Sequence, residues 1–213
     1  MEYTQPTDAD LAALVSDRIS FLDRVLSVIE NEIVPLTAEG VRGGSKIFGG
    51  AVLAKSDLST VVAVTNRETA NPLHHGEIAT INAFYEIPQS ERPAAKDTFF
   101  ISTHEPCPLC LGGITWGGWD NFFYFFSYAD TKDAFAIPHD IRIHEEIWSA
   151  TGGAYHHKNM YWSAWHLQGL INGCDADHRA QFNERSERLR NTYADLSEVY
   201  QASKGSGAEI PLA

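Results

Sequence analysis

The chain has 213 residues and a formal net charge of −12, with 44% hydrophobic and 21% charged residues. This composition is ordinary for a globular protein, and the length suits one domain with a sizeable core. No apolar run is long enough to span a membrane, and no basic segment followed by an apolar one marks a signal peptide. The acidic balance and the lack of a basic patch argue against nucleic-acid binding, because phosphate contacts supply most of that affinity.

Hydrophobic periodicity predicts a first helix over about residues 7–38, with Thr7 as its N-cap and Pro35 close to its end. Two short runs separated by a turn, residues 47–54 and 60–65, predict a β-hairpin. A helix, a strand, a helix and a strand follow, over residues 75–87, 98–103, 107–116 and 122–126. The order β-β-α-β-α-β predicts a mixed central sheet with helices on both faces, a three-layer α/β/α sandwich.

The pattern is less regular beyond residue 127. Residues 140–149 predict a short helix, and residues 176–203 predict a long amphipathic helix that packs on the rest of the chain. We expect a single domain with its core over about residues 45–150 and a helical C-terminal extension over 160–203. The tail from Gly205 to Ala213 is expected to be mobile.

Two short motifs supply the residue types that zinc prefers. His75 stands two residues before Glu77, and Cys107 and Cys110 lie one helical turn apart. One imidazole and two thiolates leave the fourth position of a tetrahedral zinc open, as in catalytic rather than structural sites. Glu77 lies about 200° around a helix from His75, so it is free to handle protons instead of binding the metal. We predict His75, Cys107 and Cys110 as zinc ligands and Glu77 as the catalytic acid–base.

Each motif is weak when taken alone. A C-x-x-C pair also occurs in redox sites and in structural zinc sites, and His74 could replace His75 as the ligand. The spacing to Glu77 favours His75. The third cysteine, Cys174, is left over and is expected to be a free thiol. Because no disulfide framework is indicated, we expect a reducing, cytoplasmic setting.

Residues 45–148 resemble the cytidine deaminase-like superfamily, whose zinc deaminases carry a His-x-Glu motif followed by Pro-Cys-x-x-Cys. The stretch from Glu105 to Trp116 is most similar to bacterial guanine deaminases and tRNA adenosine deaminases. Residues 128–147 are similar to the guanine deaminase branch, although only Asp140 remains of a phenylalanine and two aspartates that precede its short helix. At Gly76 the purine branch usually has alanine, and residues 73–78 are closer to fungal cytosine deaminases.

The resemblance implies a zinc-dependent hydrolytic deaminase of a free purine base or a similar aminated heterocycle, in which Glu77 moves the protons. It also implies that Asn66 holds the substrate base. Asp140 could accept hydrogen bonds from the ring N–H and the exocyclic amine of a guanine-like base, or could only cap the helix over 140–149. Phe48 and Trp116 are candidates to line the base, and core packing is the alternative for each.

Two other functions stay open. One is a cytosine-type deaminase, favoured by Gly76 and its flanks; the other is a protein of another class, either a non-enzymatic zinc protein or a nucleic-acid editor. Glu77 argues against a purely structural zinc, and the acidic balance argues against an editor. The resemblance further implies a homodimer, and the aromatic-rich segment 161–165 is a candidate contact because it would be costly to expose.

Overall fold

The computed structural model describes residues 3–203, Ile210 and Leu212. Within them, five strands form one mixed sheet in the order β2-β1-β3-β4-β5. The strands are β1 (Gly49–Ala54), β2 (Thr60–Thr65), β3 (Thr98–His104), β4 (Asn121–Phe126) and β5 (Ser163–His166). β1 pairs antiparallel with β2 and β3, whereas β3, β4 and β5 run parallel. Every residue of β3 and β4 is buried, as expected for strands that are covered on both faces.

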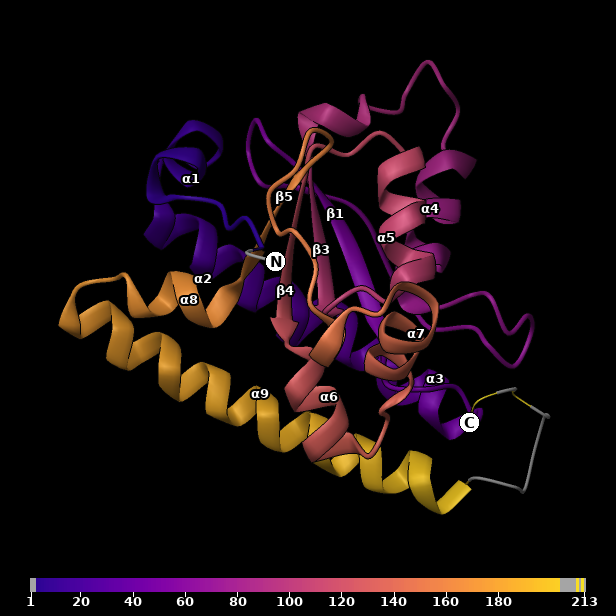
Figure 1. Cartoon of the computed structure of the whole chain (residues 1–213). Coiled ribbons are helices and arrows are strands. Elements are labelled where there is room, and N and C mark those ends of the chain that lie inside the picture. Colours follow the sequence, from indigo (N-terminus) through magenta and orange to yellow (C-terminus); the bar gives the residue numbers. More distant parts are fainter. Residues whose placement is uncertain (1–2, 204–209, 211, 213) are drawn as a thin grey trace.

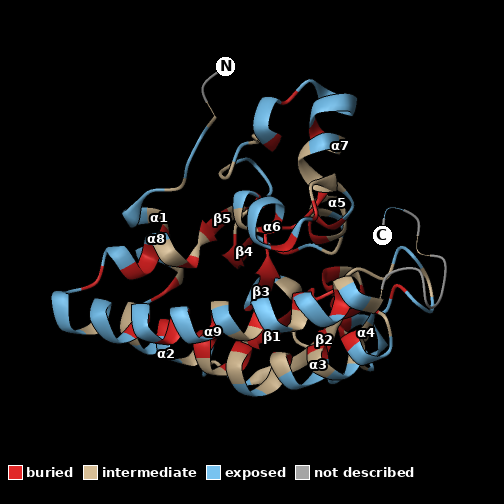
Figure 2. Ribbon diagram, turned by 90° about the horizontal axis from the view of Figure 1, so that it is seen from below, coloured by how far each residue is buried: buried red, intermediate tan, exposed pale blue. Residues whose placement is uncertain are grey.

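Helices cover both faces of this sheet (Figure 1). On one face, α4 (Gly76–Glu86) and α5 (Pro108–Trp116) pack around Phe84, Ile114 and Trp119. The other face is covered by α2 (Arg18–Val28), the π-helical turn η1 (Ile29–Ile33), α3 (Val34–Arg42), α8 (Leu167–Asn172) and α9 (Ala176–Ser203). The outer sides of α2, α3 and α9 are exposed and their sheet-facing sides are buried (Figure 2). The predicted three-layer α/β/α sandwich is therefore confirmed.

The prediction of one continuous helix over residues 7–38 is wrong, because the segment is divided into several helices. A first helix, α1 (Asp8–Leu14), ends at Val15, where the backbone becomes extended. The Asp17 side chain then accepts hydrogen bonds from the backbone N–H groups of Ile19 and Ser20, which starts α2. Such a cap satisfies N–H groups that have no partner inside the helix, so Asp17 is a start signal placed within an otherwise continuous apolar periodicity.

Pro35 does not end the helical segment as predicted. It lies at the start of α3, directly after η1, in which the N–H of Val34 bonds to the carbonyl of Ile29. A proline is tolerated in the first turn of a helix because its missing N–H would have no partner there. The widened π turn creates such a start inside a longer helical path, and the chain stays helical to Arg42.

The predicted helical extension over residues 160–203 is wrong for residues 163–166, which form β5. β5 pairs parallel with β4, and Trp165 stacks on Phe123 with 5.0 Å between ring centroids. Four residues are too few to show the alternation of a strand, so pairing with β4 decides their conformation. Trp162 and Trp165 are buried in the chain's own core, so Tyr161 is the only exposed aromatic residue of the segment that suggested a dimer contact.

Four further elements complete the described chain. α6 (Tyr128–Phe135) was not predicted, although the capping box between Ser127 and Asp130 is a start signal. α7 (His139–Trp148) matches the predicted short helix, and two 3₁₀ turns lie at Ala95–Asp97 and Thr151–Gly153.

Cys174 is a free, buried thiol as predicted. The tail predicted to be mobile, residues 205–213, lies outside the described residues except for Ile210 and Leu212. Among the helices that the structure describes, none has the length and apolar character to cross a membrane.

Candidate metal centre and catalytic site

Three side chains from the starts of two helices meet at one point. His75 directly precedes α4, Cys107 is the N-cap of α5, and Cys110 lies in the first turn of α5. Nδ1 of His75 lies 3.4 Å from Sγ of Cys107 and 3.7 Å from Sγ of Cys110, and the two sulfurs are 3.5 Å apart. A tetrahedral zinc with bonds of about 2.3 Å to sulfur and about 2.0 Å to nitrogen requires about 3.5–3.8 Å between its ligand atoms. The three atoms therefore fit a zinc ion.

The protonation of this triad also indicates a site for a cation. The contact with Cys110 lowers the pKa of Cys107 well below its ordinary value of 9.0, and His75 adds to this effect, whereas burial raises the pKa of Cys110. Burial alone would lower the pKa of His75, but the contact with Cys107 and the nearby carboxylates of Glu77 and Glu68 raise it to about 9. The group thus holds a positive charge among anions, and a bound metal ion would supply that charge instead of a proton.

The side chain of Glu77, in the first turn of α4, points toward the three proposed metal ligands. Its buried carboxylate accepts a hydrogen bond from the Cys110 thiol at 3.2 Å, and its other oxygen lies 3.0 Å from the Ser102 hydroxyl. Burial raises the pKa of Glu77 to about 7, and the Cys107 thiolate adds to the rise. A carboxyl group with a pKa near 7 can both take up and release a proton at neutral pH, as general acid–base catalysis requires.

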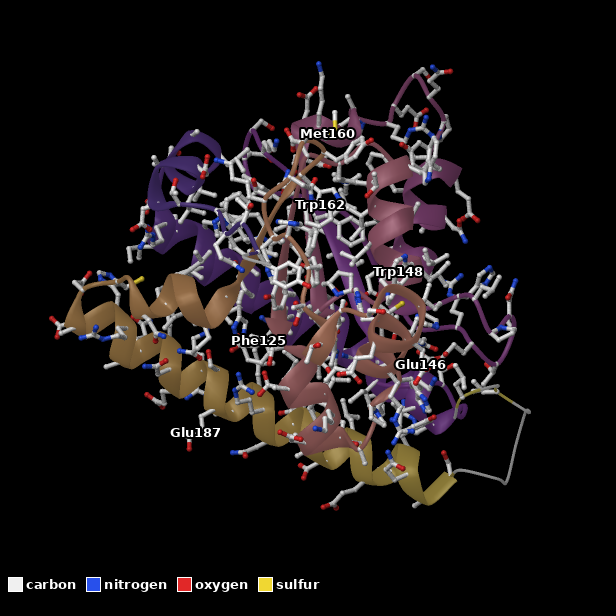
Figure 3. All side chains as sticks on the ribbon, viewed as in Figure 1. Phe125, Glu146, Trp148, Met160, Trp162 and Glu187 are labelled. Carbon is white, nitrogen blue, oxygen red and sulfur yellow. The ribbon has the colours of Figure 1, made fainter. Side chains whose placement is uncertain are left out.

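The triad opens into a cavity of about 530 Å³. Its polar lining includes Lys46, Glu68, His75 and Asp140. Its rim is apolar and comes from the loop before α4, the start of α5 and the last turns of α7, with Leu73, Leu109, Ile147 and Trp148 all more than a third exposed. Trp148, labelled in Figure 3, is the last residue of α7. Two of the proposed metal ligands, His75 and Cys107, therefore lie at the wall of a space large enough for a small organic molecule, and Cys110 and Glu77 lie behind that wall.

Two of the predicted substrate-contacting residues, Phe48 and Asp140, line this cavity. Asp140 lies in the first turn of α7, but Pro138 holds the cap position and no side chain caps this helix. Burial raises the pKa of Asp140 to about 8, and the Cys107 thiolate contributes to the rise. Asp140 is therefore not the cap of this helix, which was the alternative interpretation. Its contact with a substrate stays a prediction.

The other two predicted contacts do not line the cavity. Trp116 is the last residue of α5, about 12 Å along the helix axis from the first, and its side chain is 93% exposed. Asn66 is buried, and both ends of its amide are used by one neighbour. Nδ2 of Asn66 donates to Oε2 of Glu68 at 2.8 Å, and Oδ1 accepts from the Glu68 backbone N–H at 2.9 Å. In this structure Glu68, not Asn66, faces the cavity.

The ion pair between Lys46 and Glu68 was not predicted from the sequence. Nζ of Lys46 donates to Oε1 of Glu68 at 3.1 Å, and the exposed fractions of the two side chains are 6% and 2%. Both residues lie in loops, where no periodicity reveals which side chains point inward. The only available signal was the Asn66-x-Glu68 spacing, which suits a side chain that bonds to the backbone two residues further on.

Gly76, between His75 and Glu77, lies where no side chain fits. A Cβ atom there would lie 2.6 Å from the backbone nitrogen of Gly49 and 2.8 Å from its Cα. The start of α4 therefore rests directly on the start of β1. This close approach explains the glycine without reference to the substrate, so Gly76 no longer favours a pyrimidine deaminase.

Comparison with known proteins finds a family that this site resembles. Residues 33–126, from the end of η1 to the end of β4, match the family model of the cytidine and deoxycytidylate deaminase zinc-binding region. The matched segment contains His75, Cys107 and Cys110, so the match to a zinc-binding region supports the zinc predicted from the two motifs.

The relatives found in these comparisons include guanine deaminases. The guanine deaminase of Bacillus subtilis (strain 168) is 30% identical over 102 residues, which cover 47% of this chain and 64% of that protein. The chain thus aligns with less than two thirds of the length of this relative. A solved structure of guanine deaminase from Bacillus subtilis is 26% identical, with a TM-score of 0.42 over 55% of this chain and 69% of that one. A structure of guanine deaminase from Nitrosomonas europaea is 14% identical, with a TM-score of 0.46 over 88% of this chain and 97% of that one.

Proposed function

We propose that the chain is a zinc-dependent hydrolytic deaminase that releases ammonia from a free purine base or a similar aminated heterocycle, with guanine as the first candidate. The observation that carries this proposal is the position of Glu77. Its carboxylate is buried 3.2 Å from the sulfur of a metal ligand, beside a triad that leaves one metal position open. A structural zinc site is closed by a fourth protein ligand and has no use for such a carboxylate, so this position argues for catalysis.

The residues of the site suit the addition of water to the ring carbon that carries the amine. Zinc, when bound by His75, Cys107 and Cys110, makes water a nucleophile at neutral pH. Glu77 would take up one proton of the water and deliver it to a ring nitrogen. It would then carry the second proton, from the hydroxyl that the addition forms, to the departing amine as the carbonyl forms. A C–O bond forms, the C–N bond breaks, and ammonia leaves. The Ser102 hydroxyl lies 3.0 Å from Oε1 of Glu77 and 2.5 Å from the carbonyl oxygen of His104, so it contacts the carboxyl group that moves these protons.

The lining of the cavity favours a small base over a polynucleotide. Among the described residues that line it, Lys46 is the one lysine or arginine, and it is already paired with Glu68. Phosphate contacts would need more free cations than this. When ionised, Asp140 favours a base that offers an N–H and an amine side by side, because these two donors pair its carboxylate and a substrate without them leaves it unpaired. Guanine has this donor pair and cytosine does not, and the relative from Bacillus subtilis is a guanine deaminase.

We also propose that the protein works as a homodimer in the cytoplasm. All three cysteines are free, as suits a reducing compartment. The exposed apolar side chains that a partner could cover are those of Trp116, Ile147, Trp148, Met160 and Tyr161, each at least 57% exposed. Trp116 replaces the segment 161–165 as the candidate contact, because it is 93% exposed whereas Trp162 and Trp165 are buried.

Ammonia release tests the proposal. The zinc-loaded protein is incubated with guanine, adenine, cytosine, their nucleosides, and triazine and pterin analogues. Guanine or a heterocycle with the same donor pair should be deaminated fastest, and Glu77→Gln in the same preparation serves as the control for contaminating activity. Turnover of cytosine but not of guanine would favour the pyrimidine alternative. Ammonia release from none of these compounds would refute the proposal.

A further inference from the structure

The imidazole of His75 has anions on both sides. Its Nδ1 faces the sulfurs of Cys107 and Cys110, at 3.4 and 3.7 Å, whereas its Nε2 lies 3.4 Å from Oε1 of Glu68. A neutral imidazole carries one lone pair and one N–H, so a group that takes the N–H decides which nitrogen is left for a metal. The Glu68 carboxylate is placed to favour the tautomer with its N–H on Nε2, which leaves the lone pair of Nδ1 for the metal.

Glu68 is held more firmly than a cavity-lining side chain needs to be. Oε1 accepts a hydrogen bond from Nζ of Lys46 at 3.1 Å, and Oε2 accepts one from Nδ2 of Asn66 at 2.8 Å. The backbone N–H of Glu68 donates to Oδ1 of Asn66 at 2.9 Å, and the carboxylate side chain is 2% exposed. Burial of a carboxylate is costly unless cations and donors compensate it, and here the surroundings fix its direction as well as its charge.

We propose that Glu68 is a positioning residue for the metal centre. Its carboxylate keeps the His75 ring in the tautomer and orientation that direct Nδ1 to the two thiolates, while Lys46 and Asn66 keep the carboxylate in place. A carboxylate on the outer N–H also makes an imidazole a stronger ligand. This inference rests on the proposed function, because it requires that the triad hold zinc. It gives Asn66 a role that acts through Glu68.

Zinc affinity separates this role from a purely structural one. The dissociation constant is measured on the purified full-length chain by competition with a chromophoric chelator, using zinc alone. The variants are Glu68→Gln, which loses the charge but keeps an oxygen that can accept the Nε2–H, and Glu68→Met, which is similar in size and has no strong acceptor. Both variants break the ion pair with Lys46, but Gln can still accept a hydrogen bond from Lys46 or Asn66. The pair is therefore also compared on a Lys46→Met, Asn66→Ala background, where a difference between them belongs to the contact with His75.

We expect Glu68→Met to raise the zinc dissociation constant about 10–100-fold and Glu68→Gln to raise it clearly less. Equal constants for the two variants, or a wild-type constant for Glu68→Met, would overturn the inference. Removing the carboxylate leaves the Lys46 ammonium buried without its partner, which could unfold the variant. In that case Glu68→Met and Glu68→Gln are each made on a Lys46→Met background and compared with Lys46→Met alone. Equal zinc dissociation constants for the two double variants, or no change in Glu68→Met, would again overturn the inference.

The proposed function and this inference fail in different ways. A wild-type protein that binds zinc but releases no ammonia from the heterocycle panel refutes the deaminase, while the affinity comparison still tests Glu68. A wild-type deaminase whose zinc affinity does not depend on Glu68 refutes the positioning role alone. A wild-type protein that binds no zinc refutes both.

Discussion

His104, the last residue of β3, is a histidine that the fold keeps neutral. Its ring stacks on Phe126 at 4.7 Å between centroids and meets the edges of Phe48 and Tyr193 at 4.7 and 5.6 Å. Nδ1 lies 2.9 Å from the Thr103 hydroxyl, and Nε2 has no hydrogen-bond partner among the described residues. An imidazolium in this place would lose its hydration, so burial lowers the pKa of His104 from 6.5 to about 3.

This shift makes stability depend on pH in a calculable way. Between pH 6.5 and pH 3 the unfolded chain binds a proton at His104 that the folded chain does not. The free energy of unfolding therefore falls as the pH falls through this window, by up to about 1.4 kcal/mol per pH unit. Relative to pH 8, the loss due to His104 is about 2 kcal/mol at pH 5 and about 3 kcal/mol at pH 4.

The variant His104→Phe removes the titrating group and keeps an aromatic ring. Urea unfolding is followed at pH 7.5, 6, 5 and 4, and the free energies of the variant and the wild type are subtracted at each pH. Zinc release and other titrations are common to both proteins, so the difference reports on His104. We expect the variant to gain about 3 kcal/mol over the wild type between pH 7.5 and pH 4.

A second histidine variant provides the control. His156 is exposed, so His156→Phe should keep the pH dependence of the wild type. A His104→Phe protein that loses stability with falling pH as steeply as the wild type would refute the reasoning. It would mean that the folded protein accommodates the charged ring, for example by admitting water to Nε2.

Four other predictions concern the site and the assembly. Protein purified without added zinc should contain about one equivalent of zinc by metal analysis, and full retention in Cys107→Ala would contradict the ligand assignment. Glu77→Gln should keep zinc and fold but lose at least about 100-fold in kcat, because an amide cannot carry the proton; near-normal turnover would point to another acid–base. Asp140→Asn should lower guanine turnover far more than zinc content, and equal loss of both would make Asp140 part of the metal site instead. Light scattering should give the mass of a dimer for the wild type and a lower average mass for Trp116→Ala, whose subunits should associate more weakly. A monomeric wild type at working concentration would count against the dimer.

The metal centre could be predicted because its residues carry their own local signals. Cys107 and Cys110 lie one turn apart behind a helix start, and His75 and Glu77 stand at the start of another helix, so each pair needs only its own helix to be oriented. The sheet then brings the two helix starts together, as the order of strands and helices predicts. Four of the five strands were likewise readable from apolar runs bounded by turns.

The rest of the site depends on tertiary contacts that leave no mark in the local pattern. Lys46 and Glu68 lie in separate loops, and only the folded chain shows that they pair. Trp116 lies on the correct helix but at the wrong end of it, since an aromatic residue does not reveal which part of a helix faces a cavity. β5 was hidden by its length, and the break at Val15 was hidden by apolar spacing that continues across it.

The contact between Gly76 and Gly49 sets the distance between the His75–Glu77 motif and the sheet. With a methyl group at position 76, the start of α4 would have to withdraw from the strand by roughly 1 Å to restore ordinary van der Waals contact. His75 and Glu77 flank this position and would withdraw with it, whereas Cys107 and Cys110 would stay behind on α5. A displacement of that size can cost about 100-fold in rate even when every reacting group is intact. The smallest residue in the motif therefore sets how closely the histidine and the carboxylate approach the sheet.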